Sequence, residues 1–166
     1  MFSVGILTIS DKGSRGERED KSGQAIREFV EKQGWKVKHY RVIPDEMDKI
    51  KNQLKQMADQ HHCDLILTTG GTGLSPRDLT PEATKAVIER EVPGLAEYMR
   101  AKSLKKIATA ILSRGVCGIR GESLIINLPG SPKGVKENLE FILPVLPHGL
   151  AKLKGDTSEC AVPDKK

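Results

Sequence analysis

Short apolar segments rich in β-branched residues alternate with amphipathic segments of helical period along this chain, and this alternation constrains the fold most strongly. Strands are expected at 2–9, 35–43, 65–68, 108–112 and 124–127. Helices are expected around 26–34, 50–58, from 80 onward, 95–105 and from 132. Strands that alternate with helices predict βαβ units, and therefore a three-layer α/β/α fold with a mostly parallel sheet.

Local signals refine the predicted boundaries. Residues 11–20 are polar and contain glycine, which predicts a loop after the first strand. Thr80-Pro81 is typical of a helix start, with Thr as the cap and Pro at the first helical position. Pro144 and Pro147 are expected to break or kink the last helix.

Length and composition bound the class of protein. The 166 residues suit one domain, which we place at 1–154 and follow with a polar tail, 155–166, expected to be mobile. No apolar run has the roughly 18 residues that a membrane helix needs, and no basic leader precedes the first strand. We therefore expect a cytoplasmic protein with no membrane partner.

Charge and cysteine content narrow the partners. The net charge of +5 favours polyanionic ligands, but aromatic residues are only 4% of the chain, too few for the stacking platforms that bind single-stranded nucleic acid. Three widely spaced cysteines, Cys63, Cys117 and Cys160, form no CxxC pair. We expect no zinc site, no disulfide framework and no nucleic-acid partner.

A glycine-rich run follows the third predicted strand. Gly70-Gly71-Thr72-Gly73 lets the backbone approach a ligand and direct N–H groups at anionic oxygens. It is not a Walker A loop, because no Gly-Lys-Ser/Thr follows, and it is not a GxGxxG fingerprint, because Pro76 stands where the last glycine would be. The alternative is a tight strand-to-helix turn that binds nothing.

Carboxylates occur beside the predicted ends of the strands, where ligands bind in open parallel sheets. Asp45 and Asp78 are candidate Mg²⁺ ligands, since Mg²⁺ takes one or two carboxylates together with substrate phosphates. Asp45 also stands where a helix N-cap belongs, and Asp78 has the alternative of satisfying loop amides. Asp11 and Asp20 are further candidates, although Asp20 lies in a charge-mixed stretch typical of a solvated surface.

Other polar residues have two interpretations each. Arg77 and Arg114 either clamp phosphate or are surface charges. Asn127 either caps a turn or contacts a bound heterocycle, and the lysines around Ser103 are typical of a solvated helix face. The residues alone thus indicate a magnesium-assisted site for a phosphate-containing ligand and leave the substrate open.

At these positions the sequence resembles the MogA-type molybdopterin adenylyltransferases, which include the G domain of gephyrin. The matching stretches run in family order from about residue 4 to 154, and this ordered set is far more specific than one GGTG motif. The tail beyond Gly155 matches nothing. The stretches are Leu7–Asp11, Asp20–Gly23, Val42–Glu46, Leu67–Gly73, Pro76–Thr84, Pro93–Gly94, Ala110–Arg114 and Ile125–Pro132.

The resemblance implies a MogA/MoaB-like molybdopterin-binding fold, a homotrimer, and transfer of AMP from Mg·ATP to the phosphate of molybdopterin with release of pyrophosphate. It makes Asp45 and Asp78 the catalytic acids and the metal ligands. The molybdate-insertion enzyme is a candidate partner. The residues implied to bind nucleotide or pterin are Ser10, Asp11, Asp20, Gly70, Gly71, Thr72, Gly73, Ser103, Asn127, Pro129, Gly130 and Ser131.

A related branch provides the competing hypothesis. MoaB-like proteins share the fold and the GGTG loop, and some members of this fold act as non-catalytic pterin carriers or scaffolds. In that branch the residues at the positions of Pro44–Glu46 and Asn127 are often replaced. Both are present here, which favours the active transferase.

Overall fold

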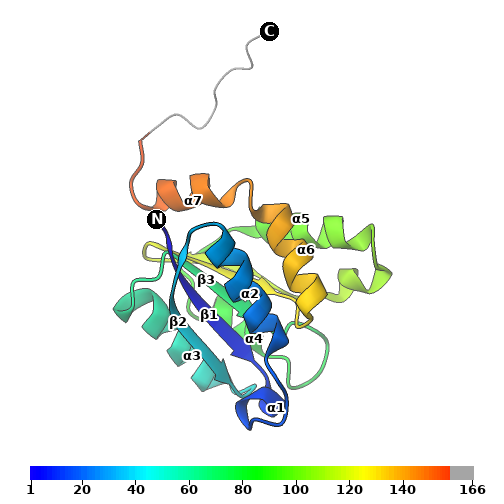
Figure 1. Ribbon diagram of the computed structural model, residues 1–166. Coiled ribbons are helices and arrows are strands. Elements are labelled where there is room, and N and C mark those ends of the chain that lie inside the picture. Colours follow the sequence, from blue (N-terminus) through cyan, green and yellow to red (C-terminus); the bar gives the residue numbers. More distant parts are fainter. Residues whose placement is uncertain (158–166) are drawn as a thin grey trace.

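Six strands form one sheet in the computed structural model, which describes residues 1–157 (Figure 1). The spatial order is β2-β1-β3-β6-β5-β4; the first four strands are parallel, and β5 and β4 extend one edge antiparallel. The predicted mostly parallel sheet is therefore confirmed. The strands are β1 (Ser3–Ile9), β2 (Lys36–Ile43), β3 (Leu65–Thr69), β4 (Arg90–Glu91), β5 (Cys117–Arg120) and β6 (Ser123–Leu128).

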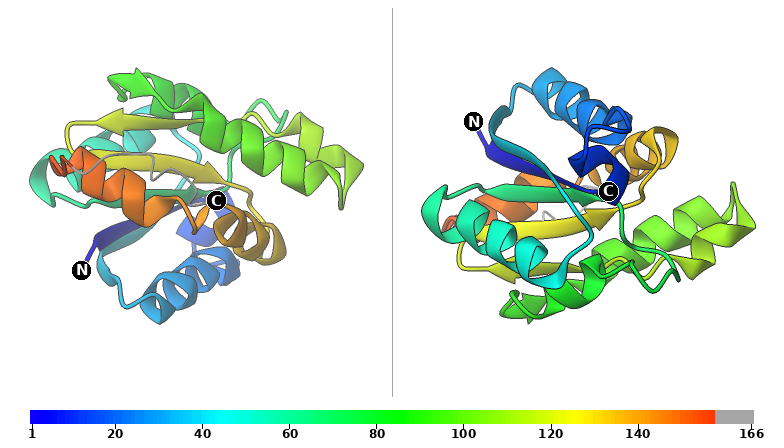
Figure 2. Two further views of the ribbon diagram at one scale, coloured as in Figure 1. Left: turned by 90° about the horizontal axis from the view of Figure 1, so that it is seen from above. Right: turned by 90° about the horizontal axis from the view of Figure 1, so that it is seen from below.

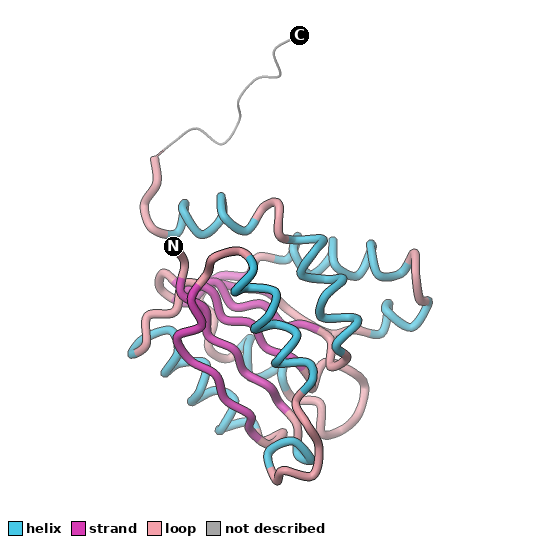
Figure 3. Tube along the Cα trace, in the orientation of Figure 1, coloured by secondary structure: helices cyan, strands magenta, loops and turns pink. Residues whose placement is uncertain are grey.

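Helices flank the sheet on both sides, as the cyan segments of Figure 3 show around the magenta strands. A π-helical segment, η1 (Gln56–Gln60), continues α3, and a 3₁₀ segment, η2 (Ala108–Leu112), follows α5. The α-helices are α1 (Asp11–Ser14), α2 (Lys21–Lys32), α3 (Met47–Lys55), α4 (Thr80–Lys85), α5 (Pro93–Leu104), α6 (Pro132–Ile142) and α7 (Leu146–Leu153).

Two apolar cores lie against the two faces of the sheet. Alternate residues of β1 divide between them: Ile6 packs with α2, α5, α6 and α7, whereas Leu7 packs with α3, η1 and α4. This is the two-residue period of a strand buried on both sides. Full burial of each Ile or Leu contributes about 1.5–3 kcal/mol. The three layers are seen edge-on in Figure 2, which confirms the predicted α/β/α architecture.

At the antiparallel edge one predicted strand is wrong and two strands were not predicted. Residues 108–112, expected as a strand, form η2, in which Ile111 and Leu112 are exposed. The strand in this region is β5, which sequence reasoning missed because its four residues include two with little apolar signal, Gly118 and Arg120. The two-residue β4 was also missed.

The predicted helix signals are only partly confirmed. The segment 11–20 contains α1 rather than loop alone. The N-cap of α4 is Leu79, and Thr80 is already helical; its hydroxyl donates to the carbonyl of Gly70 at 2.9 Å instead. The predicted break near Pro144 is confirmed, since α6 ends at Ile142 and Pro147 lies in the first turn of α7.

The remaining expectations concern termini and cysteines. Cys63 and Cys117 are free and buried, whereas Cys160 and the rest of 158–166 lie outside the described residues. The domain boundary at 154 stays a prediction. Within residues 1–157, none of the helices has the length and apolar character needed to cross a membrane.

Candidate active site

Four parallel strands end at the same edge of the sheet, and the segments that follow them line two clefts, the second of which is also lined by α5 and η2. α1 lies at the end toward which β1 points (Figure 1). The first cleft, here the acidic cleft, has a volume of about 710 Å³ and includes Asp20, Asp45 and Asp78. The second, here the apolar cleft, has about 310 Å³ and is lined by residues such as Met99, Ile107 and Leu112.

The predicted binding residues divide between these clefts, and Ser131 lines both. Asp11 lines neither but contacts Asp45. Those in the acidic cleft are Ser10, Asp20, Asp45, Gly70, Gly71, Asp78, Gly130 and Ser131. Those in the apolar cleft are Thr72, Gly73, Ser103, Asn127, Pro129 and Ser131. The structure thus gathers the predicted set at one end of the sheet.

The glycine run is held in a conformation that side chains disfavour. Gly70 and Gly71 have φ values of +94° and +65°. A Cβ at Gly70 would lie 2.3 Å from the carbonyl oxygen of Ile9, and one at Gly71 would lie 2.3 Å from Oγ1 of Thr80. Both positions therefore require glycine, which supplies positive φ and close backbone approach.

Asp45 is buried at the floor of the acidic cleft and is not a helix cap. The N-cap of α3 is Glu46, without a side-chain hydrogen bond, so the N-cap interpretation of Asp45 is wrong. Burial raises the pKa of Asp45, and the negative charges of Asp11 and Asp78 add to this, outweighing the hydrogen bond from the Asp11 backbone. A cation or a proton at this position would relieve the charge.

Asp78 follows an exposed loop, 74–77, and also lines the acidic cleft. Its Oδ2 accepts the N–H of Ser75 at 2.9 Å, so the expected bond to a loop amide is present. Oδ2 also lies 2.9 Å from where a Cβ of Gly73 would be, which keeps this carboxylate close to the glycine run.

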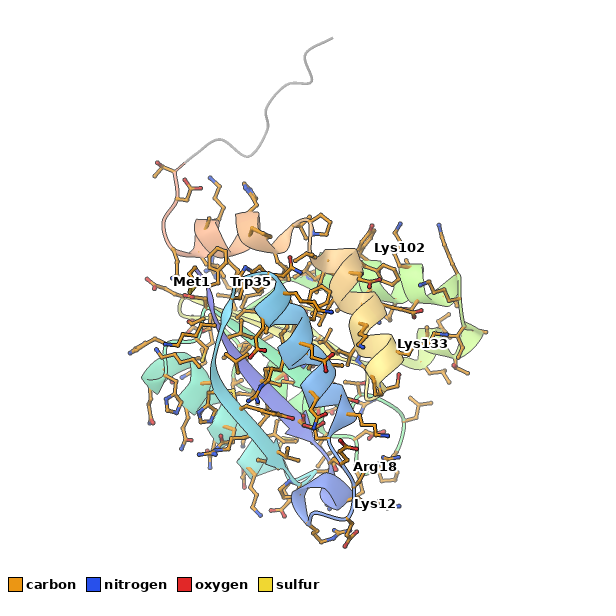
Figure 4. The ribbon with its side chains drawn as sticks, viewed as in Figure 1. Met1, Lys12, Arg18, Trp35, Lys102 and Lys133 are labelled. Carbon is orange, nitrogen blue, oxygen red and sulfur yellow. The ribbon has the colours of Figure 1, made fainter. Side chains whose placement is uncertain are left out.

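Neither candidate arginine has an uncommitted guanidinium. Arg77 makes a two-pronged ion pair with Asp11, and the hydrogen bond from Arg77 lowers the pKa of Asp11. Arg114 donates to backbone carbonyls and to Glu82. The cations that line the acidic cleft are instead Arg18 and Lys21. Figure 4 shows Arg18 beside Lys12 at this end of the molecule.

Asp20 is built into the structure, so its expected place on a solvated surface is wrong. It caps α2 by accepting the N–H of Gly23 at 2.8 Å. Its other oxygen accepts the hydroxyls of Thr8, at 2.6 Å, and of Tyr40. The capping role has a sequence signal, since an Asp directly before a helical segment is a usual N-cap. The hydroxyl partners Thr8 and Tyr40 have no such signal, and sequence reasoning missed them.

Asn127 lies in the core of the sheet rather than at a turn. Its amide nitrogen donates to the hydroxyls of Thr68 and Thr84, each at 3.0 Å, and its oxygen accepts the N–H of Val116 at 3.2 Å. The turn-capping interpretation is therefore wrong. These three bonds hold the wall of the apolar cleft, and contact with a heterocycle stays a prediction.

Two further contacts at this edge were missed. The hydroxyl of Ser22 donates to the carbonyl of Gly130 at 2.8 Å, and that of Thr69 donates to the carbonyl of Pro129 at 2.6 Å. Both fix the turn between β6 and α6 against neighbouring elements. Short hydroxyl side chains of this kind carry no pattern that distinguishes them from surface residues.

A parallel sheet covered on both faces, with acids and a glycine turn at its carboxyl edge, defines a class of α/β domain that binds phosphate-containing ligands. Residues 5–148 match the family described as a probable molybdopterin binding domain. The chain belongs to this family, and the resemblance found in the motifs is confirmed.

Individual relatives agree with this assignment. A molybdopterin adenylyltransferase of Helicobacter pylori strain J99 is 47% identical over 155 residues, 92% of this chain and 88% of that protein. The enzyme of that name from Escherichia coli K12 is 46% identical over 142 residues, 84% of this chain and 72% of that protein. A crystal structure of the molybdopterin biosynthesis enzyme MoaB from Thermus thermophilus superimposes with a TM-score of 0.89 at 58% identity, covering 94% of this chain and 98% of that one.

Proposed function

We propose that this protein is a molybdopterin adenylyltransferase of molybdenum cofactor biosynthesis, a nucleotidyltransferase that transfers AMP from ATP to the phosphate of molybdopterin and releases pyrophosphate. The relatives at 46–47% identity carry this name. The observation that carries the proposal most directly is the placement of Asp45 and Asp78 around one cleft with the Gly70–Gly71 turn.

The chain's own residues would bind and orient the two substrates. Arg18 and Lys21 offer positive charge for phosphates in the acidic cleft. The apolar cleft suits a planar heterocycle. Ser131 lines both clefts, so a substrate whose heterocycle lies in the apolar cleft and whose phosphate lies in the acidic cleft would extend past this residue. Transfer of an adenylyl group needs in-line positioning and charge neutralisation more than covalent help from the protein.

Asp45 and Asp78 would also hold Mg²⁺. Both side chains offer carboxylate oxygens, the ligand type that Mg²⁺ prefers. The raised pKa of Asp45 reflects its burial and the negative charges of its neighbours, which a bound cation would offset. Among residues 1–157 no three or more His, Cys, Asp or Glu side chains are grouped to hold a metal alone. The two acids therefore suit an ion shared with substrate phosphates, whose charge that ion would offset when bound.

The proposal extends to assembly and surroundings. We infer a homotrimer, supported by exposed apolar side chains on α5 and η2, which project beyond the sheet (Figure 2), and on the residue directly before η2. They are Leu104 on α5, Ile107 before η2, and Ile111 and Leu112 on η2. We infer a cytoplasmic location, which the use of ATP as a substrate supports. The adenylylated product makes the molybdate-insertion enzyme a candidate partner.

The competing function is a MoaB-like, non-catalytic pterin-binding or scaffold protein. The 58% identity with the MoaB structure supports a likeness to that branch but not a lack of catalysis, because that protein is itself described as an enzyme. The deciding experiment incubates purified protein with ATP, Mg²⁺ and molybdopterin and measures pyrophosphate. We expect pyrophosphate and adenylylated molybdopterin in equal amounts. Pterin binding without pyrophosphate release would favour the carrier instead.

A further inference from the structure

Arg114 lies in the segment between η2 and β5, and its guanidinium is directed at the loop that carries Asp78. Nε donates to the carbonyl of Gly73 at 2.7 Å, and Nη2 donates to the carbonyl of Asp78 at 2.6 Å. These two carbonyls are the two ends of the loop whose middle residues, 74–77, are exposed. One side chain thus binds both ends of a segment whose middle is held separately, by the ion pair of Arg77 with Asp11 and by hydrogen bonds within the loop.

Two neighbours strengthen this hold. Nη1 of Arg114 pairs with the carboxylate of Glu82 on α4. Burial alone would raise the pKa of Glu82, but the bond from Arg114 and backbone contacts lower it overall, so Glu82 remains charged and holds the guanidinium in place. The backbone N–H of Arg114 also donates to the carbonyl of Thr72 at 2.9 Å.

The same segment forms a wall of the apolar cleft. Ser113 and Gly115, on either side of Arg114, line that cleft together with Thr72 and Gly73. Arg100 on α5 fixes the segment by donating to the carbonyl of Gly115 at 2.9 Å. Arg114 therefore joins the wall of one cleft to the acid of the other.

We propose that Arg114 is a positioning residue: it binds no phosphate, and it holds the loop 73–78 so that the Asp78 carboxylate faces the acidic cleft. The inference rests on the proposed adenylyl transfer. Arg114 acts through Asp78, so its effect requires that carboxylate. Its loss moves the carboxylate without removing it, and it lowers kcat more than it changes KM for either substrate.

The test compares Arg114→Met, which cannot donate, with a matched control, Arg120→Met. Arg120 also binds a backbone carbonyl, that of Val87, and a carboxylate, that of Asp59, but lines neither cleft. We expect Arg114→Met to lower kcat by about 10- to 100-fold, the scale on which slight misplacement slows a reaction. Arg114→Lys restores part of this loss, and Arg120→Met leaves kcat unchanged.

Two readouts separate positioning from other roles. In an Asp78→Asn background, Arg114→Met is expected to change kcat by no more than about two-fold, because coupled residues are not additive. An undiminished effect there would show that Arg114 acts independently and would overturn the inference. Hydrogen exchange of the Ser75 and Asp78 amides, which make hydrogen bonds within the loop, is expected to speed up in Arg114→Met and not in Arg120→Met.

Unchanged exchange in Arg114→Met would also overturn the inference, whatever the activity. If Arg114→Met does not fold, Arg114→Lys gives the same two readouts with smaller changes. An inactive wild-type chain would instead refute the proposed function, and the exchange of the loop amides would still decide whether Arg114 holds the loop.

Discussion

The backbone N–H of Asp11 donates to Oδ2 of Asp45 at 2.9 Å, and the backbone N–H of Asp45 donates to Oδ1 of Asp11 at 3.1 Å. This reciprocal pair joins the segments that follow β1 and β2. Among residues 1–157, Oδ1 of Asp45 accepts no protein hydrogen bond, although the side chain lines the acidic cleft. One oxygen of Asp45 is therefore structural and the other is available to a ligand.

Asp45→Asn separates these two roles. The amide oxygen can still accept the N–H of Asp11, so we expect melting temperature to change little. Activity should fall by about 10²-fold or more, because a transition-state charge contact is lost. Asp45→Ala also removes the acceptor and should destabilise the fold by about 1–3 kcal/mol. Thermal melting and initial rates on the three proteins test this; near-normal rates in Asp45→Asn would remove Asp45 from the catalytic site.

The pH dependence of stability should carry the signature of Asp45. Its folded pKa is raised above the unfolded value of 3.8 by burial and neighbouring carboxylates. The group therefore stabilises the fold below the unfolded pKa, and this contribution is lost as pH rises through the folded pKa. At pH 7 Asp45→Asn should be at least as stable as the wild type. On acidification toward the unfolded pKa, the free energy of unfolding of the wild type should rise relative to that of the variant. Denaturation of both proteins across this pH range measures the difference, and a constant difference would contradict the raised pKa of Asp45.

Asp78→Asn tests the second acid. Asparagine can still accept the N–H of Ser75, so the loop should be retained while turnover falls by about 10²-fold or more. Pterin binding without nucleotide should be unaffected in Asp78→Asn.

Removal of the metal tests the metal-dependent mechanism. Wild-type turnover should stop in EDTA and return with Mg²⁺. Full activity in EDTA would disprove this mechanism.

Gly71→Ala should be strongly disruptive. Its φ of +65° and a Cβ only 2.3 Å from Oγ1 of Thr80 predict a loss of about 1–3 kcal/mol in the free energy of unfolding. Gly94→Ala is the matched control, since a Cβ there meets no atom within 4 Å. It should be neutral or stabilising by up to about 1 kcal/mol. Chemical denaturation of both variants measures the difference, and equal stabilities would show that the turn relaxes freely.

The trimer prediction can be tested at Ile111, which is 65% exposed on η2. Light scattering of the wild type should give about three times the monomer mass of 18.2 kDa. Ile111→Glu should shift this mass toward one chain, because a charge on a buried apolar contact is unfavourable. An active wild-type monomer would rule the trimer out.

The parallel half of the fold was predictable because its strands are buried on both faces. Residues 65–67 are continuously apolar, and helices such as α2 keep a clear apolar stripe. The antiparallel edge was not predictable for the opposite reason. β5 is short and half-polar, whereas residues 108–112 are apolar without being buried, so apolar pattern and burial disagree there.

The candidate site was predictable as a set of residues and not as a set of contacts. Strand ends, glycines and acids pointed to the right edge of the sheet. Asp20 is bonded by Thr8 and Tyr40, and Arg114 binds two backbone carbonyls. In both cases the partners come from segments that only the tertiary structure brings together. The local sequence allows a helix-capping role for Asp45, because it does not show that Glu46 occupies the N-cap position of α3.

The bond between Ser22 and Gly130 spans 108 positions of the chain. Both residues line the acidic cleft, which therefore forms only when α2 and the β6–α6 turn are both packed on the sheet. Unfolding of the domain destroys the cleft. A ligand that fills this cleft binds the native state and not the unfolded chain, and saturation at 100 times its dissociation constant adds about 2.7 kcal/mol to the free energy of global unfolding. Slowed amide exchange in strands far from the cleft would then report occupancy of the site, even in a variant that cannot turn over.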